Sequence, residues 1–204
     1  MPVKLNGVLV GNKAYPNGER MFDDIAKNIK EHDKIVVTMQ YQGSVDFEIL
    51  VMLISYINTL DTINYSKTLN MWYVPYLRMD RQVGTKDPMI KGIIRLFKSI
   101  SYGWTIYVLD LHNEKEWRME MNGHKCTRVE LGKFIDKILD IENIDIICYP
   151  DQGALNKYTL KYGWHHVYNY NKLPYVNANK VRDIDTGEIS KIELECGECV
   201  TANA

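Results

Sequence analysis

The sequence predicts an α/β protein in which parallel sheets are flanked by helices on both faces. Three observations support this fold class. Short apolar runs of strand length alternate along the chain with segments whose apolar residues recur at helical spacing. Helix start signals separate many of these segments. Polar segments follow several of the apolar runs, as expected where ligands bind at the carboxyl ends of parallel strands.

The predicted strands are short apolar runs bounded by polar or turn-forming residues. They span residues 5–10, 34–40, 71–77, 105–111 and 144–148. Between the first two runs, the apolar residues of segment 21–29 recur at helical spacing. Strands that are separated by helices in this way are expected to pair in parallel.

The predicted helices begin at recognisable signals. Ser44 precedes a helix with one apolar face, and Asp87-Pro88 supplies a capping side chain followed by proline at the first helical position. Thr127 and Glu130 form a capping box for a further helix. Each signal predicts a helix that covers part of a sheet.

The chain is expected to form two domains. The boundary is predicted between Leu139 and Ile144, where a capped helix ends, which gives an N-terminal domain of residues 1–142 and a partial C-terminal domain of residues 143–204. In the second domain, a strand leads to a helix that Gly163 ends. The sequence Asp185-Thr186-Gly187 then predicts the turn of a flexible hairpin.

Composition excludes several classes of protein. The net charge is −1, from 25 Lys and Arg against 26 Asp and Glu, whereas nucleic-acid-binding proteins usually carry a basic excess. No apolar run approaches the roughly 18 residues of a membrane helix, and no signal-peptide pattern is present. The four cysteines are too few to suggest a disulfide framework. We therefore expect a cytoplasmic protein without a nucleic-acid or membrane partner.

Polar segments that follow predicted strands contain candidate binding residues. Arg78 and Arg81 flank Asp80, and guanidinium groups bind phosphate oxygens while a nearby carboxylate orients them or helps to hold a metal. His112 follows the next strand and suits a metal–nucleotide site. Asp151 precedes a glycine-containing turn into a helix, where it can meet hydrated Mg²⁺ or a phosphate. Taken singly, a solvated ion-pair turn, a surface histidine and a helix cap explain these features equally well.

Two further segments are weaker on their own. The turn that contains Tyr15, Asn17 and Glu19 is explained by its Pro-Asn-Gly sequence alone. Lys180 and Arg182 precede the predicted hairpin turn, which places both cations on an arm. An exposed charged hairpin is the simpler interpretation of that arm.

The order of these segments is more informative than any one of them. The sequences are, in order, Tyr15-Pro16-Asn17-Gly18-Glu19, Pro75-Tyr76-Leu77-Arg78-Met79-Asp80-Arg81, Asp110-Leu111-His112, Pro150-Asp151-Gln152-Gly153, and Lys180-Val181-Arg182 before Thr186-Gly187-Glu188. In this order and spacing, over nearly the whole chain, the sequence resembles the ribose-phosphate pyrophosphokinases (PRPP synthetases).

The resemblance implies a phosphoribosyltransferase-like fold and a reaction. Members of the family transfer the β,γ-diphosphoryl group of Mg-ATP to the C1 hydroxyl of ribose 5-phosphate and release AMP. They work as ring-like homo-oligomers that bind ATP partly at a subunit interface.

Residue roles follow from the same resemblance. It implies that Arg78 holds the ATP phosphates, with Asp80 beside it, and that His112 and Asp151 take part in the Mg²⁺ site. Lys180 and Arg182 would close over the transferring group as the catalytic cations. The residues implied to approach the adenine of a neighbouring subunit's ATP are Tyr15, Asn17 and Glu19.

Some positions depart from the family pattern. Met79 stands where the family usually has glutamine, Val83 where it has an acidic residue, and Asn17 where it has aspartate. The chain also ends at Ala204, where the strand that leads to the sugar-phosphate loop is expected to begin. The second domain is therefore expected to be incomplete. Cys196 and Cys199 form a lone C-x-x-C pair without matching metal-ligand partners, and chance explains it best.

Two alternatives to ribose-phosphate pyrophosphokinase activity stay open. One is diphosphoryl transfer to ADP-ribose in the rebuilding of NAD, suggested by the divergent positions and the short region after His112. The other is a catalytically inert nucleotide-binding or regulatory subunit, suggested by the missing sugar-phosphate loop.

Overall fold

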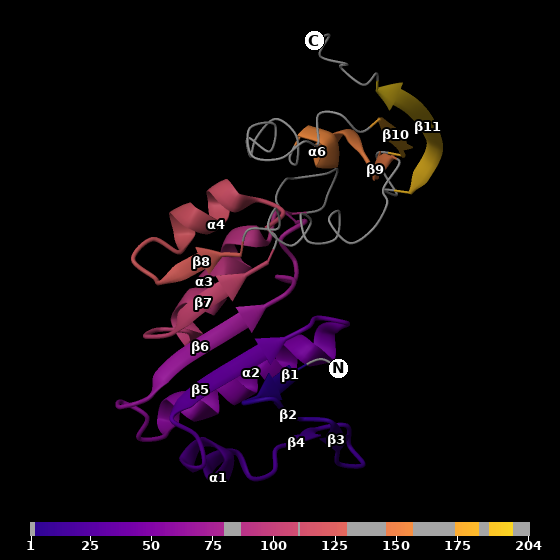
Figure 1. Ribbon diagram of the computed structural model, residues 1–204. Coiled ribbons are helices and arrows are strands. Elements are labelled where there is room, and N and C mark those ends of the chain that lie inside the picture. The colour runs from indigo at the N-terminus through magenta and orange to yellow at the C-terminus, as the bar shows by residue number, and fades with distance from the viewer. Residues whose placement is uncertain are drawn as a thin grey trace. The chain divides into compact units, whose positions relative to one another are not determined.

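The computed structural model describes residues 3–79, 87–109, 111–129, 146–156, 174–183 and 188–197 (Figure 1). The chain divides into two compact units, Met1–Val129 and Glu130–Ala204. The boundary predicted after residue 142 lies outside the described residues.

The first unit is built on a sheet of six strands in the order β2-β1-β5-β6-β7-β8. The strands are β1 Val3–Leu5, β2 Val8–Leu9, β5 Lys34–Met39, β6 Ser66–Met71, β7 Thr105–Val108 and β8 Cys126–Arg128. Strands β5 to β8 are parallel, whereas β1 pairs antiparallel with both β2 and β5. The predicted α/β class, with a sheet flanked by helices, is confirmed.

Helices connect the parallel strands of this sheet. They are α2 Ser44–Thr59, α3 Ile90–Ile100 and α4 Glu114–Glu120, and the shorter α1 Ile25–Lys30 precedes β5. Strands β5 to β8 lie side by side in chain order, and right-handed crossovers taken in one direction place successive helices on one face. The sequence predicted helices on both faces, but α2, α3 and α4 share a single face because the strand order does not reverse between β5 and β8.

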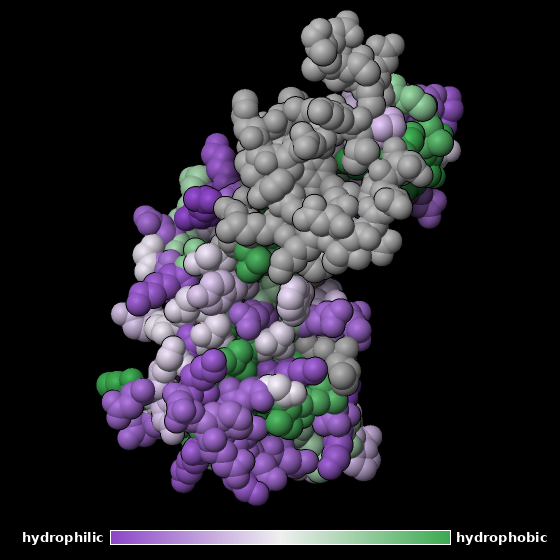
Figure 2. Space-filling view, in the orientation of Figure 1, coloured by the Kyte–Doolittle hydropathy of each residue, from purple (hydrophilic) through white to green (hydrophobic). Residues whose placement is uncertain are grey.

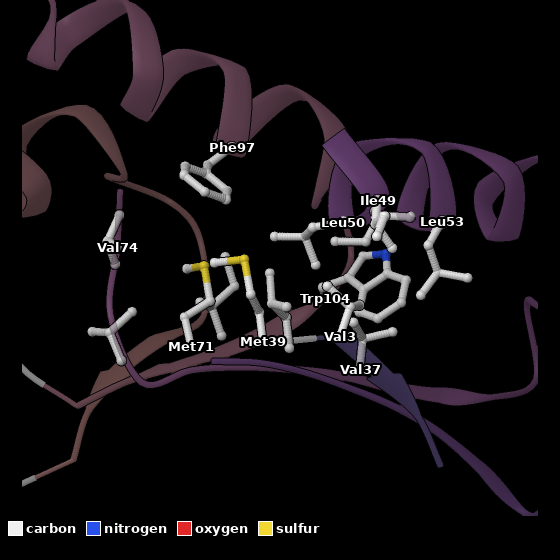
Figure 3. Packing of buried hydrophobic residues seen from close by; sticks show 14 of the residues in the cluster. Val3, Val37, Met39, Ile49, Leu50, Leu53, Met71, Val74, Phe97 and Trp104 are labelled. Atoms are coloured by element: carbon white, nitrogen blue, oxygen red, sulfur yellow. The ribbon is translucent and has the colours of Figure 1, made fainter. Parts of the chain in front are cut away.

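The core lies between this helical layer and the sheet. Figure 3 shows Leu50 of α2 and Phe97 of α3 above Val37, Met39 and Met71 of the sheet. All five side chains are at most 2% exposed. Burial of one such side chain contributes about 1.5–3 kcal/mol, so this layer dominates the stability of the unit.

The period-2 alternation of the strands leaves the other side of the sheet more polar. Thr38 and Asn70 alternate with the buried residues of β5 and β6 and are partly exposed. The described part of the first unit is mainly hydrophilic on the face that Figure 2 shows.

Two predicted strands are wrong in position. Residues 5–10 form the hairpin of β1 and β2, because Asn6 (φ 47°) and Gly7 (φ 87°) adopt the positive φ angles of a tight hairpin turn. The strand expected at residues 71–77 is β6, which ends at Met71. Polar residues alternate with the apolar residues of β6, so its sequence does not form an apolar run.

Two predicted helix starts also differ from the structure. Thr127 lies within β8, so it does not begin a helix there, and Glu130 lies outside the described residues. Helix α3 begins at Ile90 without a side-chain cap, rather than at Asp87-Pro88. The helix predicted over residues 21–29 is the shorter α1, because Met21 belongs to strand β4 Arg20–Met21.

The second unit contains a smaller sheet in the order β11-β10-β9. Its elements are β9 Ile147–Tyr149, α6 Gln152–Leu155, β10 Tyr175–Arg182 and β11 Ile189–Gly197. Strand β10 pairs parallel with β9 and antiparallel with β11. The expected turn at Asp185-Thr186-Gly187 and the expected helix end at Gly163 lie outside the described residues.

Hydrophobic residues gather on the hairpin of β10 and β11 (Figure 2). The exposed ones on β11 are Ile189, Ile192 and Leu194. Across the described ranges, no helix combines the length and the apolar character that a membrane span requires.

Candidate functional site

Asp151 is the N-cap residue of helix α6, and each of its two carboxylate oxygens contacts another described residue. Its Oδ1 accepts a hydrogen bond of 2.8 Å from the backbone N–H of Ala154, as an N-cap residue does. Its Oδ2 lies 3.4 Å from Nζ of Lys180. A side chain at Gly153 would place Cβ 3.2 Å from Oδ1, so glycine leaves room for the cap. The predicted cap is therefore present, and the carboxylate also meets the predicted catalytic lysine.

The pairing of β9 and β10 explains how Lys180 reaches Asp151. Tyr149, the last residue of β9, stands opposite Asn177 of β10. Strand β10 continues to Arg182, so Lys180 runs alongside the turn that follows β9. The Lys180 side chain is 22% exposed and that of Asp151 is 43% exposed, so solvent reaches the pair. The side chain of Arg182 lies outside the described residues.

An amide network next to this ion pair was not predicted. Asn177 is 2% exposed, and its Nδ2 donates to Oε1 of Gln152 at 2.9 Å and to Oδ1 of Asn179 at 3.0 Å. Its Oδ1 is buried without a hydrogen-bond donor among the described residues. The alternation of Asn177 and Asn179 within a strand, next to Lys180, was the signal that could have revealed this network.

Arg78 and His112 follow neighbouring parallel strands of the first unit. Arg78 is exposed in a turn in which the N–H of Met79 donates to the carbonyl of Tyr76 at 3.0 Å. His112 is exposed just before Asn113, whose Oδ1 caps α4 through the N–H of Glu116 at 3.1 Å. Strands β6 and β7 are parallel, so both residues lie at the carboxyl edge of one sheet.

The other charged residues of these two motifs lie outside the described ranges. They are Asp80, Arg81 and Asp110. The predicted role of Asp80 beside Arg78 therefore stays a prediction.

The turn that contains Tyr15, Asn17 and Glu19 connects β3 Lys13–Ala14 and β4 Arg20–Met21. The N–H of Tyr15 donates to the carbonyl of Glu19 at 2.8 Å, and Oδ1 of Asn17 accepts from the N–H of Glu19 at 3.2 Å. Asn17 is thus used to hold the turn, while Tyr15 is 52% exposed. Contact of this turn with a neighbouring subunit's adenine stays a prediction.

Tyrosines gather at the carboxyl edge of β5 and β6, which the sequence analysis did not predict. The rings of Tyr41 and Tyr73 are stacked, with centroids 5.6 Å apart and an interplanar angle of 26°. Tyr76 meets Phe47 of α2 edge to face at 5.8 Å. Burial, and after it the neighbouring Tyr76 hydroxyl, raise the pKa of Tyr41.

The described residues offer few ligands for a metal ion. Within the described ranges, no group of three or more His, Cys, Asp or Glu side chains could hold one. A single carboxylate such as that of Asp151 could bind only a Mg²⁺ ion that takes its remaining ligands from phosphates and water. The described residues by themselves therefore form no closed site for a metal ion.

Comparisons with known proteins show what the fold resembles. No protein-family model matches the chain, and no curated protein matches it. A solved structure, the phosphoribosylpyrophosphate synthetase from Mycobacterium smegmatis, matches with a TM-score of 0.56 at 17% sequence identity. The match covers 92% of this chain and 59% of that one, so the chain spans little more than half the length of that enzyme. At this identity the likeness shows a PRPP synthetase-like fold.

Proposed function

We propose that this chain transfers a diphosphoryl group from Mg-ATP to the C1 hydroxyl of ribose 5-phosphate, giving PRPP and AMP. The observation that carries the proposal is the contact of 3.4 Å between Lys180 and Asp151 beside the end of β9. These two residues were assigned to the reaction from separate motifs, 29 positions apart in the sequence. Their approach supports one site that contains both.

Phosphoryl transfer depends mainly on cations positioned around the phosphate oxygens. Lys180 would donate to the oxygens of the transferring group, where negative charge develops, and Arg182 would assist from the same strand. Asp151 would lie beside the metal and the sugar hydroxyls. Bound Mg²⁺ would neutralise part of the phosphate charge.

Residues of the first unit are also proposed to bind ATP. Arg78 would bind ATP phosphates through its guanidinium group, with Asp80 beside it, and His112 would take part in the Mg-ATP site. Tyr15, Asn17 and Glu19 would contact the adenine bound by a neighbouring subunit of a homo-oligomer.

Product analysis tests the reaction. ATP with Mg²⁺ is incubated with the chain and either ribose 5-phosphate or ADP-ribose, and the nucleotides and sugar diphosphates are resolved by chromatography. Release of AMP that depends on ribose 5-phosphate supports the proposal, whereas release that depends on ADP-ribose alone identifies the second acceptor. ATP binding without AMP release under any condition would indicate an inert subunit and refute the enzymatic proposal.

A substitution series tests the role of Lys180. Loss of one preorganised donor lowers kcat by about 10²–10³-fold in other enzymes, and we expect Lys180→Ala to do the same. Lys191→Ala is the matched control, because Lys191 lies on the neighbouring strand and pairs with Glu193 instead. An active preparation in which both variants match the wild type would show that Lys180 has no catalytic role.

A further inference from the structure

The tyrosine cluster at the carboxyl edge of β5 and β6 has features of a ligand site. We define this cluster as Tyr41, Tyr73 and Tyr76. Tyr41 lies two residues after the end of β5, and the other two residues lie in the segment that follows β6. The cluster therefore stands where adjacent parallel strands end, the usual position of ligands in such sheets.

The cluster presents aromatic surface to solvent. Tyr73 is 38% exposed, and Tyr41 and Tyr76 are partly exposed. The rings of Tyr41 and Tyr73 stack on each other at an interplanar angle of 26°, so each ring covers one face of the other. Stacked rings with an accessible side can accept a further planar ring.

The backbone at Tyr76 is strained. Its φ of 63° lies in the left-handed region, which a bulky side chain occupies at a cost of about 1–2 kcal/mol. Strain of this size persists where the surrounding structure enforces it and is common at binding sites. Here it turns the chain so that the Tyr76 carbonyl closes the turn that carries Arg78. Tyr73 and Tyr76 of the cluster and Arg78, the residue proposed to bind phosphate, therefore belong to the segment that follows β6.

We propose that the tyrosine cluster is a stacking site for the base of a nucleotide whose phosphates lie on Arg78. The inference rests on the proposed function only in requiring a nucleotide ligand. It gives the base a contact within the same chain, whereas the turn at Tyr15 was predicted to serve a neighbouring subunit. Met79, which stands where related enzymes have glutamine, adds an apolar side chain that is 39% exposed in the same turn.

Binding of two probes separates a base contact from a phosphate contact. The affinities of Mg-ATP and of magnesium tripolyphosphate, which has no base, are measured by isothermal titration calorimetry. Because base stacking on the ring is lost, Tyr73→Ala should weaken ATP binding about 10-fold, which corresponds to about 1.4 kcal/mol. The affinity for tripolyphosphate should not change. Tyr73→Phe retains the ring and should bind ATP as the wild type does.

Two further variants complete the design. Tyr102→Ala removes a tyrosine that is 81% exposed and lies just before β7, and it should leave both affinities unchanged. Arg78→Ala should lower the affinity for both Mg-ATP and magnesium tripolyphosphate. The inference is overturned if Tyr73→Ala binds ATP normally, if it loses tripolyphosphate equally, or if only Tyr15→Ala lowers the affinity for ATP. None of these binding measurements requires turnover. An inactive protein would therefore refute the proposed reaction, while the stacking site would still be tested by the binding affinities.

Discussion

Asp46 fixes the start of α2 and the loop that leads into it, and its removal should destabilise the first unit measurably. Its Oδ2 accepts hydrogen bonds from the N–H groups of Gln42 at 2.6 Å and Gly43 at 3.1 Å. The residue is 6% exposed, so water replaces these bonds poorly when the carboxylate is removed. The carboxylate also lies in the first turn of the helix, where negative charge is favourable.

The size of the effect follows from these contacts. A hydrogen bond to a charged group contributes about 1.5–3 kcal/mol, and loss of a helix N-terminal cap costs about 0.5–2 kcal/mol. Both bonds reach one oxygen and are partly redundant, so we expect Asp46→Ala to lower the free energy of unfolding by about 3 kcal/mol. Asp46→Asn keeps an acceptor oxygen without its charge and should cost about half as much.

Urea denaturation followed by tryptophan fluorescence measures the loss. Trp104 and Trp117 are each 1% exposed in the core of the first unit, so their emission reports on its unfolding. Glu48→Ala is the matched control, because Glu48 is exposed on the same helix and such changes usually stay within about 0.5 kcal/mol. Unfolding of Asp46→Ala at the same urea concentration as Glu48→Ala would contradict the predicted role of the Asp46 carboxylate.

Two other predictions concern single side chains. Asn6 has a φ of 47°; its Oδ1 accepts from the N–H of Val36 at 2.8 Å, and its Nδ2 donates to Oδ1 of Asn28 at 3.1 Å. Asn6→Ala and Asn6→Gly both lose these two bonds, but only the alanine variant adds backbone strain. The alanine variant should be less stable than the glycine variant by about 1 kcal/mol in urea, and equal stability would contradict the strain. Burial raises the pKa of the Cys126 thiol, so near neutral pH it should react with iodoacetamide more slowly than the exposed Cys148, as mass spectrometry of the modified peptides can measure. Equal rates would show that Cys126 is accessible.

The sequence was most informative where a pattern was strong and local. Helix α2 and strand β5 were located correctly, because each contains a run of apolar residues bounded by polar or turn-forming ones. Asn6-Gly7 strongly predicts a hairpin turn. The apolar residues on both sides of this pair nevertheless led to the prediction of one strand over residues 5–10. Strand β6 was predicted too late in the chain, because its exposed positions are polar. A sheet with one exposed face permits polar residues at such positions.

The candidate site was only partly predictable for a different reason. Asp151 and Lys180 were identified from separate motifs, and their contact depends on the register of β9 against β10, which no local pattern specifies. The partners of Asn177 depend on the same register. The stacking of Tyr41 on Tyr73 joins residues that follow different strands, so neither segment reveals it alone.

The double engagement of Asp151 has a consequence for the order of events in the proposed reaction. Loss of the Oδ1 bond would uncap α6 at a cost of about 1 kcal/mol, whereas the solvent-accessible pair at Oδ2 contributes less. In the proposed reaction, a metal ion or a sugar hydroxyl that binds Oδ2 would take the place of the Lys180 ammonium group. Lys180 would then be able to bind the phosphate oxygens, so binding at one carboxylate oxygen would be coupled to the position of the lysine.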